Sequence, residues 1–160
     1  MYVENNQTAI DHFLLPCGPE VYLFTVVFSA GAYTYTIKNV NNAVAAVTVS
    51  GIPTAIRVQN AVMYDGRIVY WCGGNQYGAF DAVTGAVVIA AVDNANATYA
   101  INVMKNSENN TIDVYMFLNG STKKGLYVKN GSNALTQVVA NVEYIGRKTN
   151  YTGFLALPTA

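Results

Sequence analysis

The sequence predicts an all-β fold: antiparallel, with about ten short strands, arranged as a β-sandwich, a jelly roll or a small propeller. Runs rich in β-branched and aromatic residues dominate, and their apolar residues recur at every second position, as in half-buried strands. Asn- and Gly-rich turns separate the runs at intervals of about 8–12 residues. The chain of 160 residues is long enough for one well-buried domain. We therefore expect a single domain over residues 1–160, with an irregular arm over residues 1–20.

Hairpin turns mark the first half of the chain most clearly. Ala30-Gly31 separates the strands expected over residues 21–28 and 33–37. Asp65-Gly66 predicts a two-residue hairpin turn of type I′ between a strand ending near Tyr64 and one starting near Arg67. Further strands are expected over residues 44–49, 55–64, 67–72, 77–80, 86–92, 99–104, 111–118, 126–129, 135–144 and 154–157.

The run AVVIAAV over residues 86–92 is continuously apolar. A short run of this kind is typical of a central strand that is buried on both faces. The core residues expected from this and the neighbouring patterns are Val87, Ile89, Val92, Phe24, Val26, Val114 and Met116.

Charge is unusually sparse. Charged residues make up 11% of the chain, with nine basic and nine acidic side chains, against roughly 25% in ordinary soluble domains. A chain without a basic excess is a poor partner for nucleic acid, and a neutral chain does not repel its own copies. The longest apolar stretch, over residues 21–32, is too short to span a membrane. No secretory signal is visible at the start. We expect a virion or an extracellular surface as the location, and a virion subunit would need no such signal because virions assemble inside the cell.

The sequence contains few candidate catalytic residues. His12 is the only histidine, and it has no obvious partner apart from Cys17 or a serine brought to it by the fold. Among the carboxylates, Asp113 and Glu143 fall inside expected strands and are the best candidates for a glycosidase pair. No CxxC or HxxxH spacing is present to bind a metal. We therefore expect no enzyme activity, no cofactor and no metal site.

An aromatic cluster surrounds the Asp65-Gly66 hairpin. Its members are candidate contacts with a ligand or a partner: Tyr64, Tyr70, Trp71 and Tyr77. Strand alternation places Tyr70 and Trp71 on opposite faces, so one of the two is expected in the core.

Two kinds of covalent modification remain open. Cys17 and Cys72 are either a disulfide pair or two free thiols. Asn-x-Ser/Thr sequons are more frequent than chance predicts, and they reflect either glycosylation or the chemistry of Asn-Gly-Ser turns. The sequons begin at Asn6, Asn96, Asn109, Asn119, Asn130 and Asn150.

Residues 60–92 resemble a blade of the quinoprotein-type β-propellers. The matching positions are Asp65, Gly66, Val69, Tyr70, Gly78, Phe80, Asp81, Ala82, Thr84, Gly85, Val87 and Val88. This resemblance covers about a fifth of the chain and implies a four-stranded sheet there.

In overall style the neutral, Asn-, Thr- and Tyr-rich chain also resembles the β-rich subunits of archaeal virus capsids and surface filaments. That resemblance implies a non-enzymatic structural protein, the subunit of a homomeric virion or surface assembly. The partners it implies are further copies of the chain and other assembly proteins. The alternative is a carbohydrate- or receptor-binding β module, such as an adhesin or a small propeller.

Overall fold

The computed structural model describes residues 11–57, 60–93, 98–119, 124–130, 135–140, 142–147 and 154–158. These residues form strands and connecting turns, with no helix among them. The strands are β1 (Asp11–Cys17), β2 (Glu20–Ser29), β3 (Ala32–Asn39), β4 (Val47–Ile52), β5 (Ala61–Tyr64), β6 (Ile68–Gly73), β7 (Gln76–Asp81), β8 (Val87–Asp93), β9 (Thr98–Asn106), β10 (Thr111–Asn119), β11 (Lys124–Asn130), β12 (Leu135–Ala140), β13 (Val142–Arg147) and β14 (Phe154–Pro158).

The strands form three four-stranded sheets and one two-stranded sheet, all antiparallel. The first sheet is β1-β2-β3-β4, the second β5-β6-β7-β8 and the third β9-β10-β11-β12, and β13 pairs with β14. In every sheet the paired strands are neighbours in the sequence, so the described strands contain no Greek-key crossover. The sequence-based prediction of an antiparallel all-β fold is confirmed.

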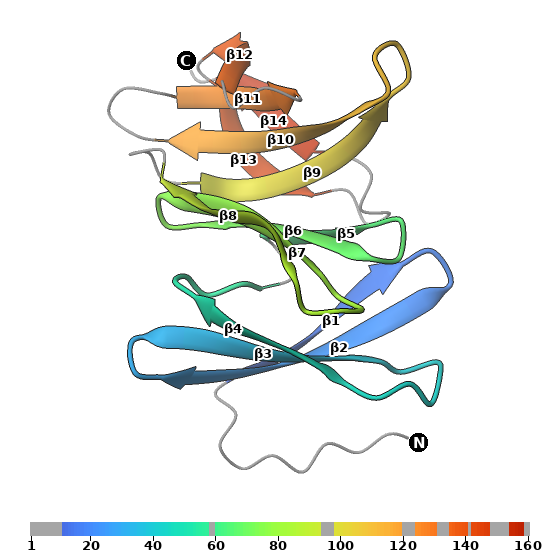
Figure 1. The fold of residues 1–160 in the computed structure, drawn as a ribbon. Coiled ribbons are helices and arrows are strands. Elements are labelled where there is room, and N and C mark those ends of the chain that lie inside the picture. The colour runs from blue at the N-terminus through green and yellow to red at the C-terminus, as the bar shows by residue number, and fades with distance from the viewer. Residues whose placement is uncertain are drawn as a thin grey trace.

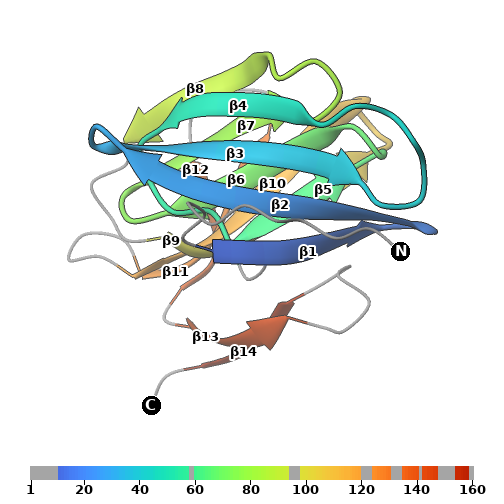
Figure 2. The same cartoon turned by 90° about the horizontal axis from the view of Figure 1, so that it is seen from below.

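The three large sheets are stacked face to face in chain order (Figure 1). The opening strands of successive sheets lie together at one edge, because β5 contacts β1 and β9, and β9 contacts β13. The last strands, β4, β8 and β12, form the opposite edges of their sheets. This series of meander sheets has the strand order of propeller blades, and β13 and β14 lie on the side of β1 (Figure 2).

Two hairpin turns follow from local sequence. Ala30 and Gly31 have φ values of 51° and 79° and join β2 to β3 as a two-residue turn, as predicted. Asp65 and Gly66 also have positive φ, and the Arg67 N–H donates to the Tyr64 carbonyl at 3.1 Å. The first strand pair after this turn is Tyr64 with Ile68, so the loop includes Arg67 and is one residue longer than predicted.

Two hydrophobic cores separate the sheets. The first core lies between the first and second sheets and contains Phe24, Tyr35 and Trp71. The second core lies between the second and third sheets and contains Ile101 and Met116. The second sheet thus supplies one face to each core. Burial is confirmed for four residues predicted from the sequence: Phe24, Val26, Val114 and Met116.

The irregular arm predicted over residues 1–20 is wrong over the part that the structure describes. Residues 11–17 form β1, which pairs along its whole length with β2, and its Leu15 is only 1% exposed in the first core. Pro16 and the polar start of the segment weakened its strand signal. Pro16 is tolerated because β1 is an edge strand, where a residue without an N–H need not interrupt the hydrogen bonds between strands.

The prediction that β8 is a central strand buried on both faces is also wrong. β8 is the last strand of the second sheet and pairs on one side only, with β7. Val87 is 58% exposed, Val92 is exposed as well, and Ile89 is half-buried against the second core. A continuous apolar run is equally compatible with an edge strand, since the pattern carries no information about the strand's neighbours.

Candidate functional site

The aromatic cluster predicted to contact a ligand is largely internal. Trp71 points into the first core, whereas Tyr70 and Tyr77 point into the second, with Tyr64 packed against its margin. Burial raises the pKa of Tyr70 and of Tyr77 above the ordinary value. Three of the four rings are therefore structural, and none of these three offers an exposed flat face to a sugar.

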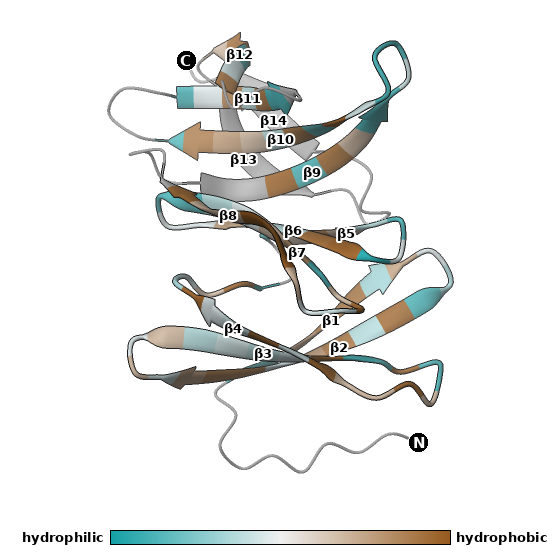
Figure 3. Ribbon diagram, in the orientation of Figure 1, coloured by the Kyte–Doolittle hydropathy of each residue, from teal (hydrophilic) through white to brown (hydrophobic). Residues whose placement is uncertain are grey.

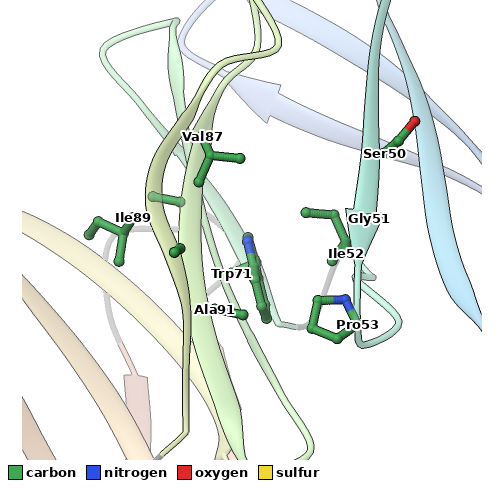
Figure 4. Close-up of a pocket in the computed structure, with 10 residues that line it drawn as sticks. Ser50, Gly51, Ile52, Pro53, Trp71, Val87, Ile89 and Ala91 are labelled. Atoms are coloured by element: carbon green, nitrogen blue, oxygen red, sulfur yellow. The ribbon is translucent and has the colours of Figure 1, made fainter.

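Trp71 is positioned by a glycine on the neighbouring strand. Trp71 pairs across the sheet with Gly78, and a Cβ added at Gly78 would lie 2.6 Å from Trp71 Cζ2. The indole therefore lies flat against the β7 backbone. Although the indole is only 1% exposed, it lines the base of a small groove between the outer strands of the first and second sheets (Figure 4).

This groove has a volume of about 180 Å³. Its walls are Ser50, Gly51, Ile52 and Pro53 on one side and Val87, Ile89, Ala90 and Ala91 on the other, with Trp71 and Ala79 between them. No lining residue is ionisable, so the groove has no group for acid–base catalysis. It suits a small apolar group.

A charged network holds the turn between β7 and β8. Asp81 Oδ1 accepts hydrogen bonds from the N–H groups of Val83 and Thr84, and Arg67 Nε donates to Oδ2 at 2.5 Å. Burial of Asp81 acts to raise its pKa, but these hydrogen bonds outweigh it, so the pKa lies below the ordinary value. Both carboxylate oxygens of Asp81 are thus engaged, Oδ1 by the backbone of the turn and Oδ2 by the Arg67 side chain, which marks the residue as structural.

The candidate catalytic residues are not brought together. His12 and Cys17 lie five residues apart on β1, roughly 16 Å along a strand, and on opposite faces of the sheet. Asp113 is buried and accepts from Asn106 Nδ2 at 3.1 Å, and the side chain of Glu143 lies outside the described set. Among the described residues, no cluster of three or more His, Cys, Asp or Glu side chains could hold a metal.

Cys17 and Cys72 form no disulfide in the structure. Cys17 packs against the first core and Cys72 lies in the second, so the second sheet separates them. The Cys17 sulfur instead accepts from the Gly66 N–H at 3.2 Å.

Of the six sequon asparagines, Asn109 and Asn119 are exposed at the ends of β10. Asn109 Oδ1 accepts from the N–H and the hydroxyl of Thr111, a turn interaction that needs no glycan. The side chains of the other four, Asn6, Asn96, Asn130 and Asn150, lie outside the description.

The most distinctive surface is formed by the outer strands, defined here as β4, β8 and β12. Asp93, at the end of β8, is the one charged residue on these three strands. Val87, Val88, Val138 and Val139 are exposed on them, and Figure 3 shows hydrophobic residues along β8. Sequence analysis missed this surface because it placed β8 in the core.

Each outer strand carries a β-bulge. The pairing register shifts once along β3–β4, twice along β7–β8 and once along β11–β12. Bulges bend an edge strand away from flat pairing with another strand. The outer edges of the three sheets are therefore protected against edge-to-edge pairing, so another molecule at these edges would contact mainly side chains.

Comparison with known proteins identifies no relative: no protein-family model, no curated protein and no solved structure matches the chain. The described residues also contain no helix long and apolar enough to cross a membrane.

Proposed function

We propose that this protein is a non-enzymatic structural subunit that works as repeated copies of itself in a virion or a surface assembly. The observation that carries the proposal is the exposure of uncharged, apolar outer strands, led by Val87 and Val88 of β8. Monomeric proteins rarely leave contiguous apolar surface in water. Contact between copies would remove it.

The kind of contact follows from the chemistry of this surface. Its bulged strands disfavour continuous sheets between copies, so subunits meet through Val and Thr side chains of these strands. Because few ion pairs are available, the association depends weakly on salt.

Sedimentation velocity at micromolar concentration, from low to high salt, tests the proposal. We expect oligomers or particles that persist across the salt range. A chain that stays monomeric at every salt and protein concentration refutes homomeric assembly.

The alternative is a module that binds a receptor or a carbohydrate, and the groove beside Trp71 is where an apolar group of such a ligand would bind. Trp71 is the only tryptophan, so its fluorescence reports directly on occupancy of the groove. A saturable change on adding glycans or a receptor peptide to a monomeric chain would favour this alternative over assembly.

A further inference from the structure

The Asn-x-Ser/Thr sequons are unevenly distributed along the chain. Residues 11–93, which form the first and second sheets, contain five asparagines and no sequon. Residues 94–160 contain eleven asparagines and ten serines and threonines among 67 residues, for which chance gives about 1.6 sequons. Five are present there, beginning at Asn96, Asn109, Asn119, Asn130 and Asn150. The excess of sequons therefore belongs to the part of the chain that contains the third sheet.

These five sequons begin at the ends of strands or between strands. Asn119 and Asn130 are the last residues of β10 and β11, and Asn109 lies in the turn between β9 and β10. Asn96 and Asn150 fall in the sequence between β8 and β9 and between β13 and β14, outside the described residues. Turn chemistry alone does not explain this pattern, because the turns of the first two sheets use glycines with positive φ and contain no sequon.

The sequon that begins at Asn109 is described in full. Residues 107–110 are all exposed, and the turn they form extends beyond the stacked sheets (Figure 1). Asn109 Oδ1 accepts hydrogen bonds from the Thr111 N–H at 3.1 Å and from the Thr111 hydroxyl at 2.5 Å. Asn109 Nδ2, the atom to which an N-linked glycan is joined, donates no hydrogen bond within the described residues. The side chain therefore presents its amide nitrogen to solvent, with the hydroxyl of the sequon beside it.

We propose that Asn109 is a glycosylation site and carries an N-linked oligosaccharide. The co-reactant is an oligosaccharide joined through its anomeric carbon to a lipid pyrophosphate. Asn109 Nδ2 forms a bond to that carbon, the bond from the carbon to the pyrophosphate oxygen breaks, and the amide loses one proton as the lipid pyrophosphate leaves. Nothing is oxidised or reduced in this step. The inference goes beyond the proposed function and does not depend on contact between copies.

A glycan at this turn supplies solvation that the chain otherwise lacks. Charged residues make up only 11% of the sequence, and the third sheet leaves Met104, Val138 and Val139 exposed. N-linked glycans are bulky and solubilising, so a glycan beside this sheet compensates for sparse charge. The same bulk excludes the β9–β10 turn from close contact between copies, whereas the first and second sheets, which have no sequon, stay available for it.

Mass spectrometry of the protein isolated from the cells that naturally produce it tests the proposal. The peptide that contains Asn109 should carry the additional mass of an oligosaccharide, and fragmentation should place that mass on Asn109. Asn110 is the internal control, because it is exposed in the same turn but does not begin a sequon. It should be unmodified in the same peptide.

Matched variants made in the same cells separate glycosylation from the structure of the turn. Asn109→Asp keeps the oxygen that accepts from Thr111 but has no amide nitrogen, so the glycan should be lost while the fold is kept. Thr111→Ser keeps the sequon and should keep the glycan, whereas Thr111→Val should lose it. Near-ultraviolet circular dichroism establishes that each variant is folded.

An unmodified Asn109 in the natural protein overturns the proposal, and so does an oligosaccharide that stays on Asn109 in Thr111→Val. Neither result bears on homomeric assembly, which sedimentation tests separately.

Discussion

The two ends of the stack of sheets differ in how their outer faces are treated. On the third sheet, three side chains that point away from the second core are nevertheless buried, Asn102, Asp113 and Phe117, whereas Met104 on the same face is 52% exposed. On the first sheet, the equivalent face leaves Leu14 exposed and Leu23 half-buried but buries Thr25. The third sheet has β13 packed against β9 and β11, and the first has no described strand in that place.

This difference shows how a two-stranded sheet can act as a cap. Four-stranded sheets in series each bury one face of the next, so the two terminal faces need separate treatment. At the C-terminal end, β13 lies against β9 and β11. At the N-terminal end, no described strand lies against the outer face, which carries the exposed Leu14.

The largest expected effect separates the two ends directly. Phe117→Ala should destabilise the protein by about 3–5 kcal/mol, because the 2% exposed ring leaves a cavity. Leu14→Ala should cost about 1 kcal/mol or less, since half of its surface is already in water. Urea unfolding measured at a concentration where the protein is monomeric compares the two. Similar costs would show that the ends do not differ.

The interface between the first and second sheets is fully covered, so a substitution there gives a reference value for the stability cost of disturbing a packed sheet face. Gly78→Ala should cost about 1–3 kcal/mol, because the new methyl group meets the buried Trp71 ring and the Ile89 carbonyl. Trp71 fluorescence during thermal unfolding reports the change. Gly73→Ala serves as the control, since its nearest neighbours are side-chain atoms of Asn60 and Thr54, which can move. An unaltered melting temperature for Gly78→Ala would mean that the indole is not held against β7.

Local signals predicted the hairpins, and they failed where the answer depends on distant strands. Ala30-Gly31 and Asp65-Gly66 set their own backbone geometry, so their turns could be predicted from a few residues. The exposure of β8 could not, because burial depends on whether another strand lies beyond it. The aromatic cluster was misplaced for the same reason: a ring beside a turn is a ligand contact or a core residue according to the sheet that packs over it.

The stability contributed by the turn after β7 should depend on pH, because hydrogen bonds to the ionised Asp81 carboxylate hold this turn. The pKa of Asp81 is lowered in the folded state. Ionised Asp81 therefore contributes fully to the free energy of unfolding above the ordinary pKa of about 4, and this contribution is lost as the pH falls through the pKa of the folded state. Asp81→Asn should cost about 2 kcal/mol at neutral pH, by losing the charged hydrogen bonds. The difference in the free energy of unfolding between the wild type and Asp81→Asn should become smaller below about pH 4. Asp65→Asn, at an exposed turn position, is the control. If the difference in free energy of unfolding between the wild type and Asp81→Asn does not change with pH, the ionised carboxylate does not have this role.

The smallest effect concerns the hydroxyl of Thr25 in β2. Thr25 is only 1% exposed, and its Oγ1 is a buried polar atom without a hydrogen-bond partner among the described residues. Thr25→Val removes this oxygen while keeping the branched shape that suits a strand. The substitution should stabilise folding by about 1 kcal/mol, because a buried polar atom without a partner is replaced by a methyl group. Urea unfolding of the wild type and the variant measures the difference in the free energy of unfolding. A chain destabilised by Thr25→Val would show that the hydroxyl already has a partner within the chain.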